Sequence, residues 1–209
     1  MLALSQIIYG VRDLDAATRR IEARGLTVIE GGRHPGLGTA NRIVPLGDAY
    51  FELLGVVDEA EAQGNPYGQA LLRQIAHGDR LVRWSLRTDG LDAIAAARGL
   101  AVEHRTRHRP DGTLLTWRAA GLTLALIAGW LPFFMQWDDP AQYPGLTPAA
   151  HRVEPQGIAW LELTPGDPDL LQHWVGDTAA TEIPLRFVPG NPGLHRVALQ
   201  TPHGELVLP

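Results

Sequence analysis

The sequence predicts an α+β protein made of a duplicated βαβββ unit and a shorter third unit. The first observation is that the order strand, helix and three strands occurs twice along the chain. The second is that the tetrapeptide Ala-Arg-Gly-Leu follows the helix of both units, at residues 23–26 and 97–100. Duplication favours this fold because each copy covers a sheet face that the other leaves open.

The first unit is expected to cover residues 1–64. Asp13 is a good N-cap for its helix, and Gly25 is a typical helix stop. The turn Gly47-Asp48 separates two strand-like runs, so these runs should form a hairpin. The expected elements are a strand at 4–11, a helix at 16–23, and strands at 26–30, 39–46 and 49–57.

Residues 65–79 should hold a connecting helix with Pro66 in its first turn. The second unit then covers residues 80–140 and repeats the order of the first. Its turn at Arg109-Pro110-Asp111-Gly112 carries strong turn residues. The expected elements are a strand at 81–87, a helix ending at Ala97, and strands at 101–105, 114–119 and 122–128.

The third unit, residues 156–209, is expected to pack on the same domain. A strand at 157–164 precedes a short helix that Asp167 caps and that ends near Trp174. A closing hairpin should pair residues 194–200 with 205–208. The segment 138–155 is rich in Pro and Ala and is predicted to be a linker.

Composition narrows the function. Hydrophobic residues make up 45% of the chain and charged residues 20%, which is typical of a soluble globular protein. A net charge of −5 and scattered arginines argue against nucleic acid as a partner. No signal peptide or membrane-spanning run is evident, so we expect a cytoplasmic protein without a membrane partner.

Missing residue types exclude several kinds of chemistry. The chain has no Cys, and all 18 of its basic residues are Arg, so it has no Lys. Thiolate nucleophiles, cysteine zinc sites, Schiff bases and the phosphate-loop lysine are therefore absent. Neither serine lies in a G-x-S-x-G motif.

One acid, Glu52, lies within an otherwise apolar strand, where an unpartnered carboxylate is costly. This position indicates a lined cavity, a buried pair or a metal; an exposed edge strand is the simpler alternative. A turn at Gly47-Asp48 places Ile43 opposite Glu52 and Asn41 one pair further along. Asn41 and Glu52 then share one face, and Asn41 is able to donate a hydrogen bond to the carboxylate.

Three segments resemble the vicinal oxygen chelate superfamily, and its glyoxalase-like branch in particular. They are Gly31-Gly32-Arg33-His34 with Gly38-Thr39-Ala40-Asn41-Arg42, then Tyr50-Phe51-Glu52-Leu53-Leu54, and Leu131-Pro132-Phe133-Phe134-Met135-Gln136-Trp137. The resemblance covers most of residues 1–190. It implies that the two units form a curved mixed sheet around a cleft, and it implies a possible homodimer.

The resemblance also bears on metal binding. In similar metal-bearing sequences, the first and last strands of each unit supply ligands, and here those positions in the first unit are Gln6 and Glu52. When the second unit is aligned with the first by its turns, Ala125 corresponds to Glu52, and Arg83 or Trp84 corresponds to Gln6. Only two donors remain, whereas a catalytic metal needs about three protein ligands. We therefore expect no metal and no other cofactor.

Further residues are candidates for contact with a small molecule. His34 lies in a predicted Gly-rich loop, either at a pocket rim, as the resemblance implies, or on the open surface. The dense apolar run at residues 132–137 is typical either of a pocket or of a dimer interface. The predicted substrate-binding residues are Gln6, Asn41, Trp84, Trp117, Gln136 and Trp137.

Three functions are compatible with these features. In the first, Glu52 is the general base of a metal-free lyase or isomerase, and His34 and Asn41 polarise a carbonyl of a small, largely apolar substrate. In the second, the protein binds or sequesters such a molecule without turnover. In the third, the chain is a structural or dimerisation module with a vestigial cleft.

Overall fold

The first unit of the chain forms the predicted βαβββ arrangement. The protein is described here by a computed structural model, which covers residues 2–176 and 184–209. Asp13 caps the first helix by accepting a hydrogen bond from the Ala16 amide at 2.9 Å. The elements are β1 (Ala3–Val11), α1 (Leu14–Ala23), β2 (Ile29–His34), β3 (Thr39–Pro45) and β4 (Tyr50–Val56).

Two short helices, α2 (Glu59–Gln63) and α3 (Pro66–Ile75), connect the units. Asn65 caps α3 through a 2.8 Å hydrogen bond from the Gly68 amide, and Pro66 occupies the first turn, as predicted. The second unit contains β5 (Arg80–Arg87), α4 (Leu91–Arg98), β6 (Val102–His108), β7 (Leu114–Ala120), α5 (Leu122–Ile127) and β8 (Phe133–Trp137).

The end of the second unit differs from the prediction. Residues 122–127 form the helix α5, whereas the sequence suggested a strand at 122–128. The closing strand is β8, inside the apolar run that was expected to be a pocket wall or an interface. A short apolar run has no periodicity that separates a helix from a buried strand, and Leu and Ala in this run favour helix. The proposed equivalence of Glu52 and Ala125 is therefore wrong.

The C-terminal residues form a second, smaller sheet. The predicted linker contains two short 3-10 helices, η1 (Pro140–Gln142) and η2 (Pro144–Leu146), and buries Tyr143, which donates to the Ser5 carbonyl at 2.8 Å. The third unit comprises β9 (Ile158–Thr164), α6 (Pro168–Val175), β10 (Leu185–Phe187), β11 (Gly193–Thr201) and β12 (Gly204–Leu208).

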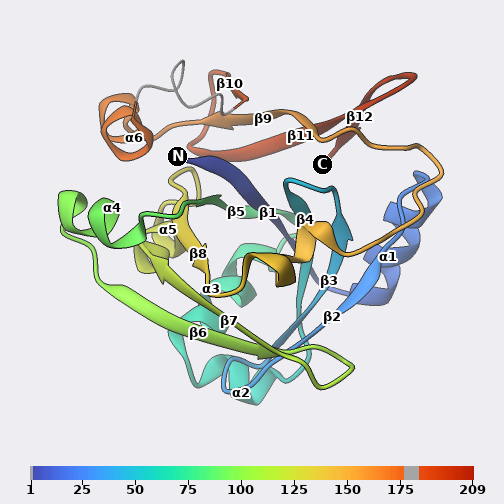
Figure 1. Cartoon of the computed structure of the whole chain (residues 1–209), viewed down its shortest axis with the longest axis horizontal. Helices are drawn as coiled ribbons and strands as arrows, with labels where there is room; N and C mark the ends of the chain where they lie inside the picture. Colours follow the sequence, from blue (N-terminus) through green and yellow to red (C-terminus); the bar gives the residue numbers. More distant parts are fainter. Residues whose placement is uncertain (1, 177–183) are drawn as a thin grey trace.

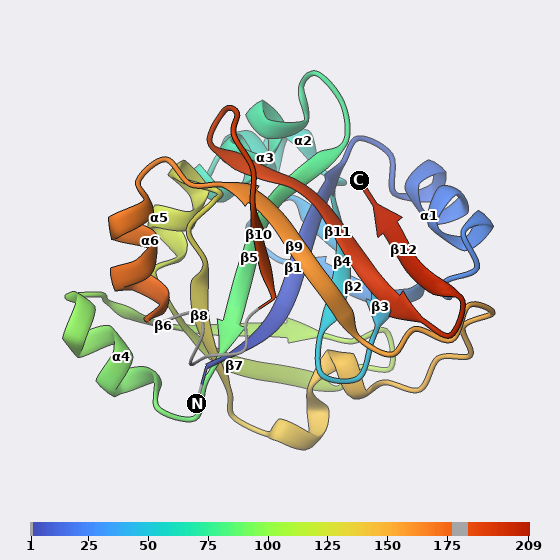
Figure 2. The same ribbon diagram turned by 90° about the horizontal axis from the view of Figure 1, so that it is seen from above.

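The two sheets lie on top of each other. Eight strands are ordered β2-β3-β4-β1-β5-β8-β7-β6, and four are ordered β10-β9-β11-β12. Figure 1 shows the large sheet curving strongly, with the small sheet above β1 and β5, and Figure 2 shows β9 and β11 crossing over these two strands. One apolar core joins the sheets and includes Trp84 and Leu53 from the large sheet with Leu161 and Leu199 from the small one.

The two units meet along a central pair of strands. β1 and β5 run antiparallel, while β4 is parallel to β1 and β8 is parallel to β5. The units are thus related by a local twofold axis between β1 and β5. Both hairpins extend from this centre, and their strands curve toward each other on the face away from the small sheet (Figure 1).

Within the described residues, no helix combines the length and apolar character that crossing a membrane would need.

Candidate functional site: a cleft inside the curved sheet

The concave face of the large sheet encloses a cleft. It contains about 800 Å³ of space free of protein atoms, including the part open to solvent. Its wall is mostly apolar, with a few polar side chains between the aromatic and aliphatic ones, as small-molecule sites generally are. The apolar lining residues are Ile8, Leu37, Leu54, Leu71, Trp117, Leu122, Phe133, Met135 and Trp137.

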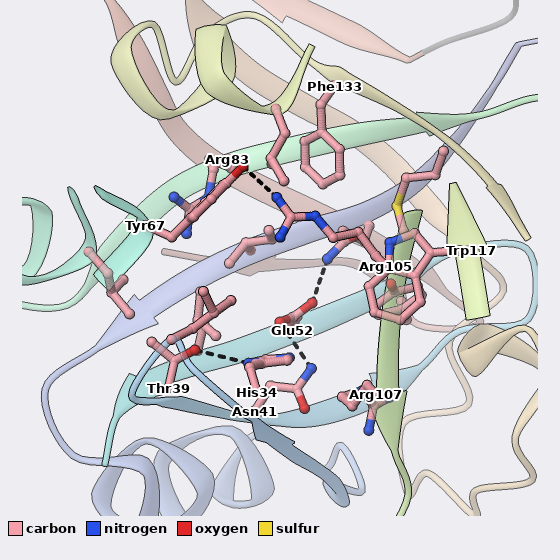
Figure 3. A pocket seen from close by; sticks show the side chains of 18 of the residues that line it. His34, Thr39, Asn41, Glu52, Tyr67, Arg83, Arg105, Arg107, Trp117 and Phe133 are labelled. Carbon is pink, nitrogen blue, oxygen red and sulfur yellow. Dashed lines mark hydrogen bonds between the residues drawn. The ribbon is translucent and has the colours of Figure 1, made fainter. Parts of the chain in front are cut away.

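Glu52 lies on this wall and is held by two amide side chains. The pairing of β3 with β4 puts Ile43 opposite Glu52 and Asn41 opposite Leu54, which confirms the predicted register. Asn41 Nδ2 donates to Glu52 Oε1 at 3.0 Å, and Gln6 Nε2 donates to the other oxygen, Oε2. Both hydrogen bonds are drawn in Figure 3. The carboxylate therefore has a fixed orientation within the cleft.

This network continues behind Gln6. Ser85 Oγ donates to Gln6 Oε1 at 3.3 Å, so the Gln6 amide is itself oriented by β5. Burial raises the pKa of Glu52 above its usual value, and the Asn41 hydrogen bond and the charges of Arg107 and Arg83 oppose this increase. The exposed-edge alternative for Glu52 does not apply, because only 5% of the residue is exposed.

His34 also lines the cleft, but as part of a strand. The sequence suggested a loop, whereas His34 is the last residue of β2 and pairs with Thr39 across the hairpin. Its Nδ1 lies 3.0 Å from Thr39 Oγ1. Burial, assisted by the positive charges of Arg107, Arg83 and Arg105, lowers the pKa of His34 to about 4. The imidazole is consequently neutral at pH 7 and can act as a hydrogen-bonding group.

Three arginines complete the polar part of the wall, and none was among the predicted site residues. Arg83 extends from β5, and Arg105 and Arg107 extend from alternate positions of β6. Figure 3 shows Arg83 beside Tyr67 and across the pocket from His34, with Glu52 between them. A charged residue within the apolar run of residues 81–86 was a signal available in the sequence, analogous to that of Glu52.

An aromatic pair forms one end of the cleft. The rings of Trp117 in β7 and Trp137 in β8 have centroids 5.2 Å apart and face the same space as Phe133 and Met135. Both tryptophans were among the predicted substrate-binding residues. The structure brings these two together with Gln6, Asn41, Glu52 and His34 in one cavity.

Two predicted contact residues lie elsewhere. Trp84 is fully buried in the core between the two sheets, where its Nε1 donates to the Trp130 carbonyl at 3.0 Å. Gln136 points to the other face of β8, and its Oε1 accepts from the Leu91 amide at 3.2 Å and from Arg118 Nη2 at 2.9 Å. Side chains alternate between the two faces of a sheet, so Trp84 and Gln136 lie on the face away from the lining residues of β5 and β8.

The strand pairing also fixes which residues occupy the superfamily's metal-ligand positions. Gln6 lies opposite Ser85 and Ile8 opposite Arg83, so the local twofold axis superposes Gln6 on Arg83. Glu52 neighbours Ile8, and its counterpart is therefore the neighbour of Ser85, which is Phe133.

These four residues do not fit a metal ion. The guanidinium of Arg83 is cationic and Phe133 has no lone pair, which leaves only Gln6 and Glu52 as donors. The Gln6 amide nitrogen, moreover, is engaged with Glu52. Among the described residues, no cluster of three or more His, Asp or Glu side chains suitable for a metal is found.

The βαβββ duplication, the concave eight-stranded sheet and the cleft inside it define a protein of the vicinal oxygen chelate superfamily. The chain belongs to the glyoxalase-like domain family, whose sequence profile matches residues 6–179. A comparison with curated proteins finds no significant match.

Many solved structures are similar to this chain, and two of them match nearly all of it. A hypothetical protein from Staphylococcus aureus aligns with 99% of this chain and 84% of its own, with a TM-score of 0.63 and 14% identity. The Mn(II)-bound glyoxalase from Novosphingobium aromaticivorans aligns with 98% of this chain and 79% of its own, with a TM-score of 0.50 and 14% identity. At identities this low, the structural likeness shows a shared fold only. The chemistry has to be inferred from the residues of the site.

Proposed function

We propose that the cleft binds a small, largely apolar carbonyl compound and that Glu52 removes a proton from the carbon next to the carbonyl. The observation that carries this proposal is the oriented carboxylate in an apolar wall. Gln6 and Asn41 hold both oxygens of Glu52, and burial raises its pKa toward the range useful to a general base at neutral pH.

The reaction needs neither a metal nor a redox partner. The C–H bond breaks, the proton moves to a Glu52 oxygen, and the electron pair moves toward the carbonyl oxygen to give an enolate. Return of the proton to a different position completes an isomerisation, while loss of a leaving group from the next carbon completes a lyase reaction. In the tautomer in which Nδ1 accepts from the Thr39 hydroxyl, a neutral His34 carries its proton on Nε2 and is suited to donate to the enolate oxygen.

Asn41 has a different role in this scheme from the one its sequence position suggested. Its amide nitrogen donates to Glu52, so Asn41 is a positioning residue for the base. Removal of Asn41 would leave the carboxylate held by Gln6 alone and would withdraw the largest contribution opposing the rise in its pKa.

Binding without turnover is the second candidate function. The same hydrogen bonds favour it, because both Glu52 oxygens already accept an amide hydrogen. The oxygen that removes the substrate proton would have to accept that proton as well. A carboxylate oxygen can accept more than one hydrogen bond, which leaves the catalytic scheme sterically open. The two functions differ in whether carbon-bound hydrogen exchanges with solvent.

Deuterium exchange tests this difference. The native protein, with and without prior chelator treatment, would be incubated in D2O with 4-phenylbutan-2-one or 2-oxo-4-phenylbutanoate, and loss of the C3 protons followed by NMR. We expect exchange above the buffer rate with at least one probe, and a loss of roughly 100-fold or more in Glu52→Gln. Glu22→Gln, on the exposed face of α1, is the matched control and should retain the native rate.

Exchange at the native rate in Glu52→Gln would contradict a role for Glu52 as base. Saturable binding of a probe without any exchange would favour the binding function instead.

A further inference from the structure

The Arg83 side chain lacks the partners that a buried charge normally has. Only 5% of Arg83 is exposed, and its Nη1 is buried without a hydrogen-bond partner. Within residues 2–176 and 184–209, no hydrogen bond or ion pair to its guanidinium is found. Buried guanidinium groups are ordinarily paired, because removing this charge from water costs several kcal/mol. Burial accordingly lowers the pKa of Arg83 to about 10.

Glu52 is the obvious counter-ion, but the geometry assigns it other partners. No nitrogen of Arg83 lies within the 4.0 Å that defines an ion pair with the carboxylate, and both Glu52 oxygens are occupied by amide donors. Glu52 attracts Arg83 through space only. The fold thus places a carboxylate and a guanidinium on the same cleft wall, on either side of β1, without a hydrogen bond between them.

The remaining charges on the wall are also positive. Arg107 is 4% exposed, and among the described residues its guanidinium makes a hydrogen bond only to the Gly31 carbonyl. Arg105 pairs with Glu103 and donates to the Tyr67 hydroxyl, while its Nε is buried without a partner. Three arginines therefore face a cleft whose lining contains a single acid.

The rest of the cleft restricts the ligand further. Phe133, Met135 and the Trp117–Trp137 pair offer an apolar surface and carry no charge. The Trp137 Nε1 is the one buried polar atom without a partner on these four described side chains. A ligand that satisfies both regions has an anionic group at one end and an apolar, preferably aromatic, body at the other.

We propose that the ligand of this cleft is a small carboxylic acid with an apolar body, and that Arg83 binds its carboxylate. A planar guanidinium matches a carboxylate in two parallel hydrogen bonds, and Arg83 has its donors free for this purpose. Arg105 and Arg107 line the same cleft and add positive charge to it. This inference rests on the proposed function only in taking the cleft as the ligand site, and it narrows the substrate from carbonyl compounds to carboxylates, such as 2-oxo acids.

Binding of matched probes tests the proposal. Titration of 4-phenylbutanoate and of neutral 4-phenylbutan-1-ol would be followed by quenching of tryptophan fluorescence, because Trp117 and Trp137 line the cleft. We expect the native protein to bind the carboxylate at least 10-fold more tightly than the alcohol. Arg83→Met should lose most of this preference, while its affinity for the alcohol changes little.

Two controls keep the result interpretable. Arg80→Met removes an exposed arginine from the same strand and should bind both probes like the native protein. The melting temperature of ligand-free Arg83→Met should equal or exceed that of the native protein, since the substitution removes an unpaired buried charge. A structural arginine would instead lower the melting temperature when replaced.

Equal affinity of the native protein for the two probes, an unchanged carboxylate preference in Arg83→Met, or no saturable binding of either probe would overturn the carboxylate proposal. Proton exchange that depends on Glu52 but not on a probe's carboxylate would leave the proposed function standing alone. Binding that depends on Arg83 without any exchange would leave the carboxylate site and refute the base.

Discussion

The most informative residues of this protein are buried charged ones. Glu52 lies in β4 of the first unit and Arg83 in β5 of the second, these two strands flank β1, and each residue is only 5% exposed. Glu52 accepts hydrogen bonds from two neutral amides, while the guanidinium of Arg83 makes no hydrogen bond to any other described residue. Buried charged residues lower the free energy of unfolding. Their presence is explained when they bind a ligand.

His34 provides a prediction at the same scale. Its pKa is about 4 in the folded protein and 6.5 in an ordinary environment, so the unfolded chain takes up this proton first as the pH falls. His34 therefore lowers stability progressively from pH 6.5 toward pH 4. Between pH 7 and pH 4.5 the loss is about 2–3 kcal/mol.

We expect His34→Gln to lose correspondingly less stability than the native protein over this range, as measured by urea unfolding at both pH values. His203→Gln, in the exposed turn between β11 and β12, is the control. Equal acid sensitivity of the native protein and His34→Gln would show that the imidazole is not buried in neutral form.

At the scale of single elements, the β3–β4 hairpin positions the proposed base. A tight turn after Leu46 fixes the register, and the register puts Asn41 and Glu52 on the concave face. β2 pairs with β3 beside this hairpin, and the pairing has a bulge between Glu30 and Gly32. Gly31 therefore passes directly against the Asn41 side chain.

Gly31→Ala tests this contact. The new methyl group would overlap with Oδ1 of the Asn41 side chain and lie 2.8 Å from the main-chain oxygen of Asn41. The side-chain amide of Asn41 would therefore have to move, which disturbs its hydrogen bond to Glu52. We expect a destabilisation of about 1–3 kcal/mol in urea unfolding, together with slower proton exchange. Gly90→Ala is the control, because its nearest neighbour is 4.0 Å away. Native stability and native exchange in Gly31→Ala would mean that Asn41 does not position the base.

At the scale of the whole molecule, the small sheet covers the convex face of the large one. Trp174 in α6 is central to this contact, with its ring centroid 5.9 Å from that of Phe134 and its Nε1 donating to the Pro132 carbonyl at 2.7 Å. Because one apolar core joins the sheets, we propose that all three units form a single folding domain.

Trp174→Ala should therefore destabilise the entire protein by about 3–5 kcal/mol, and Trp174→Phe by less. In calorimetry, both variants should keep a single transition whose calorimetric and van't Hoff enthalpies agree. Two resolved transitions, with only the lower one shifted by the substitution, would mean that the C-terminal sheet unfolds independently.

Much of the fold and half of the site follow from local signals in the sequence. The helix caps Asp13 and Asp167, Pro66 and the turn at Gly47-Asp48 act over a few residues, so their elements could be predicted. The same turn predicts the hydrogen bond between Asn41 and Glu52, because register and alternation are sufficient to bring them together.

Other features depended on contacts between distant segments. The closing strand of the second unit is β8, which pairs with β5 about 50 residues earlier in the chain, and no local pattern encodes this pairing. Alternation sets Trp84 and Gln136 apart from the lining residues of their strands, but only the packing of the sheet shows which face lines the cleft.

By itself, the sequence determined the duplicated units, the hairpin register and the buried acid, because turns and side-chain alternation operate within one hairpin. Only the tertiary structure decided what faces that acid. Arg83, Arg105 and Arg107 lie 31, 53 and 55 residues after Glu52 in the sequence, and the curvature of the shared sheet brings them to its cleft. The physical reason is that the groups surrounding a buried charged side chain come from distant strands. They are brought together only when the whole sheet has formed.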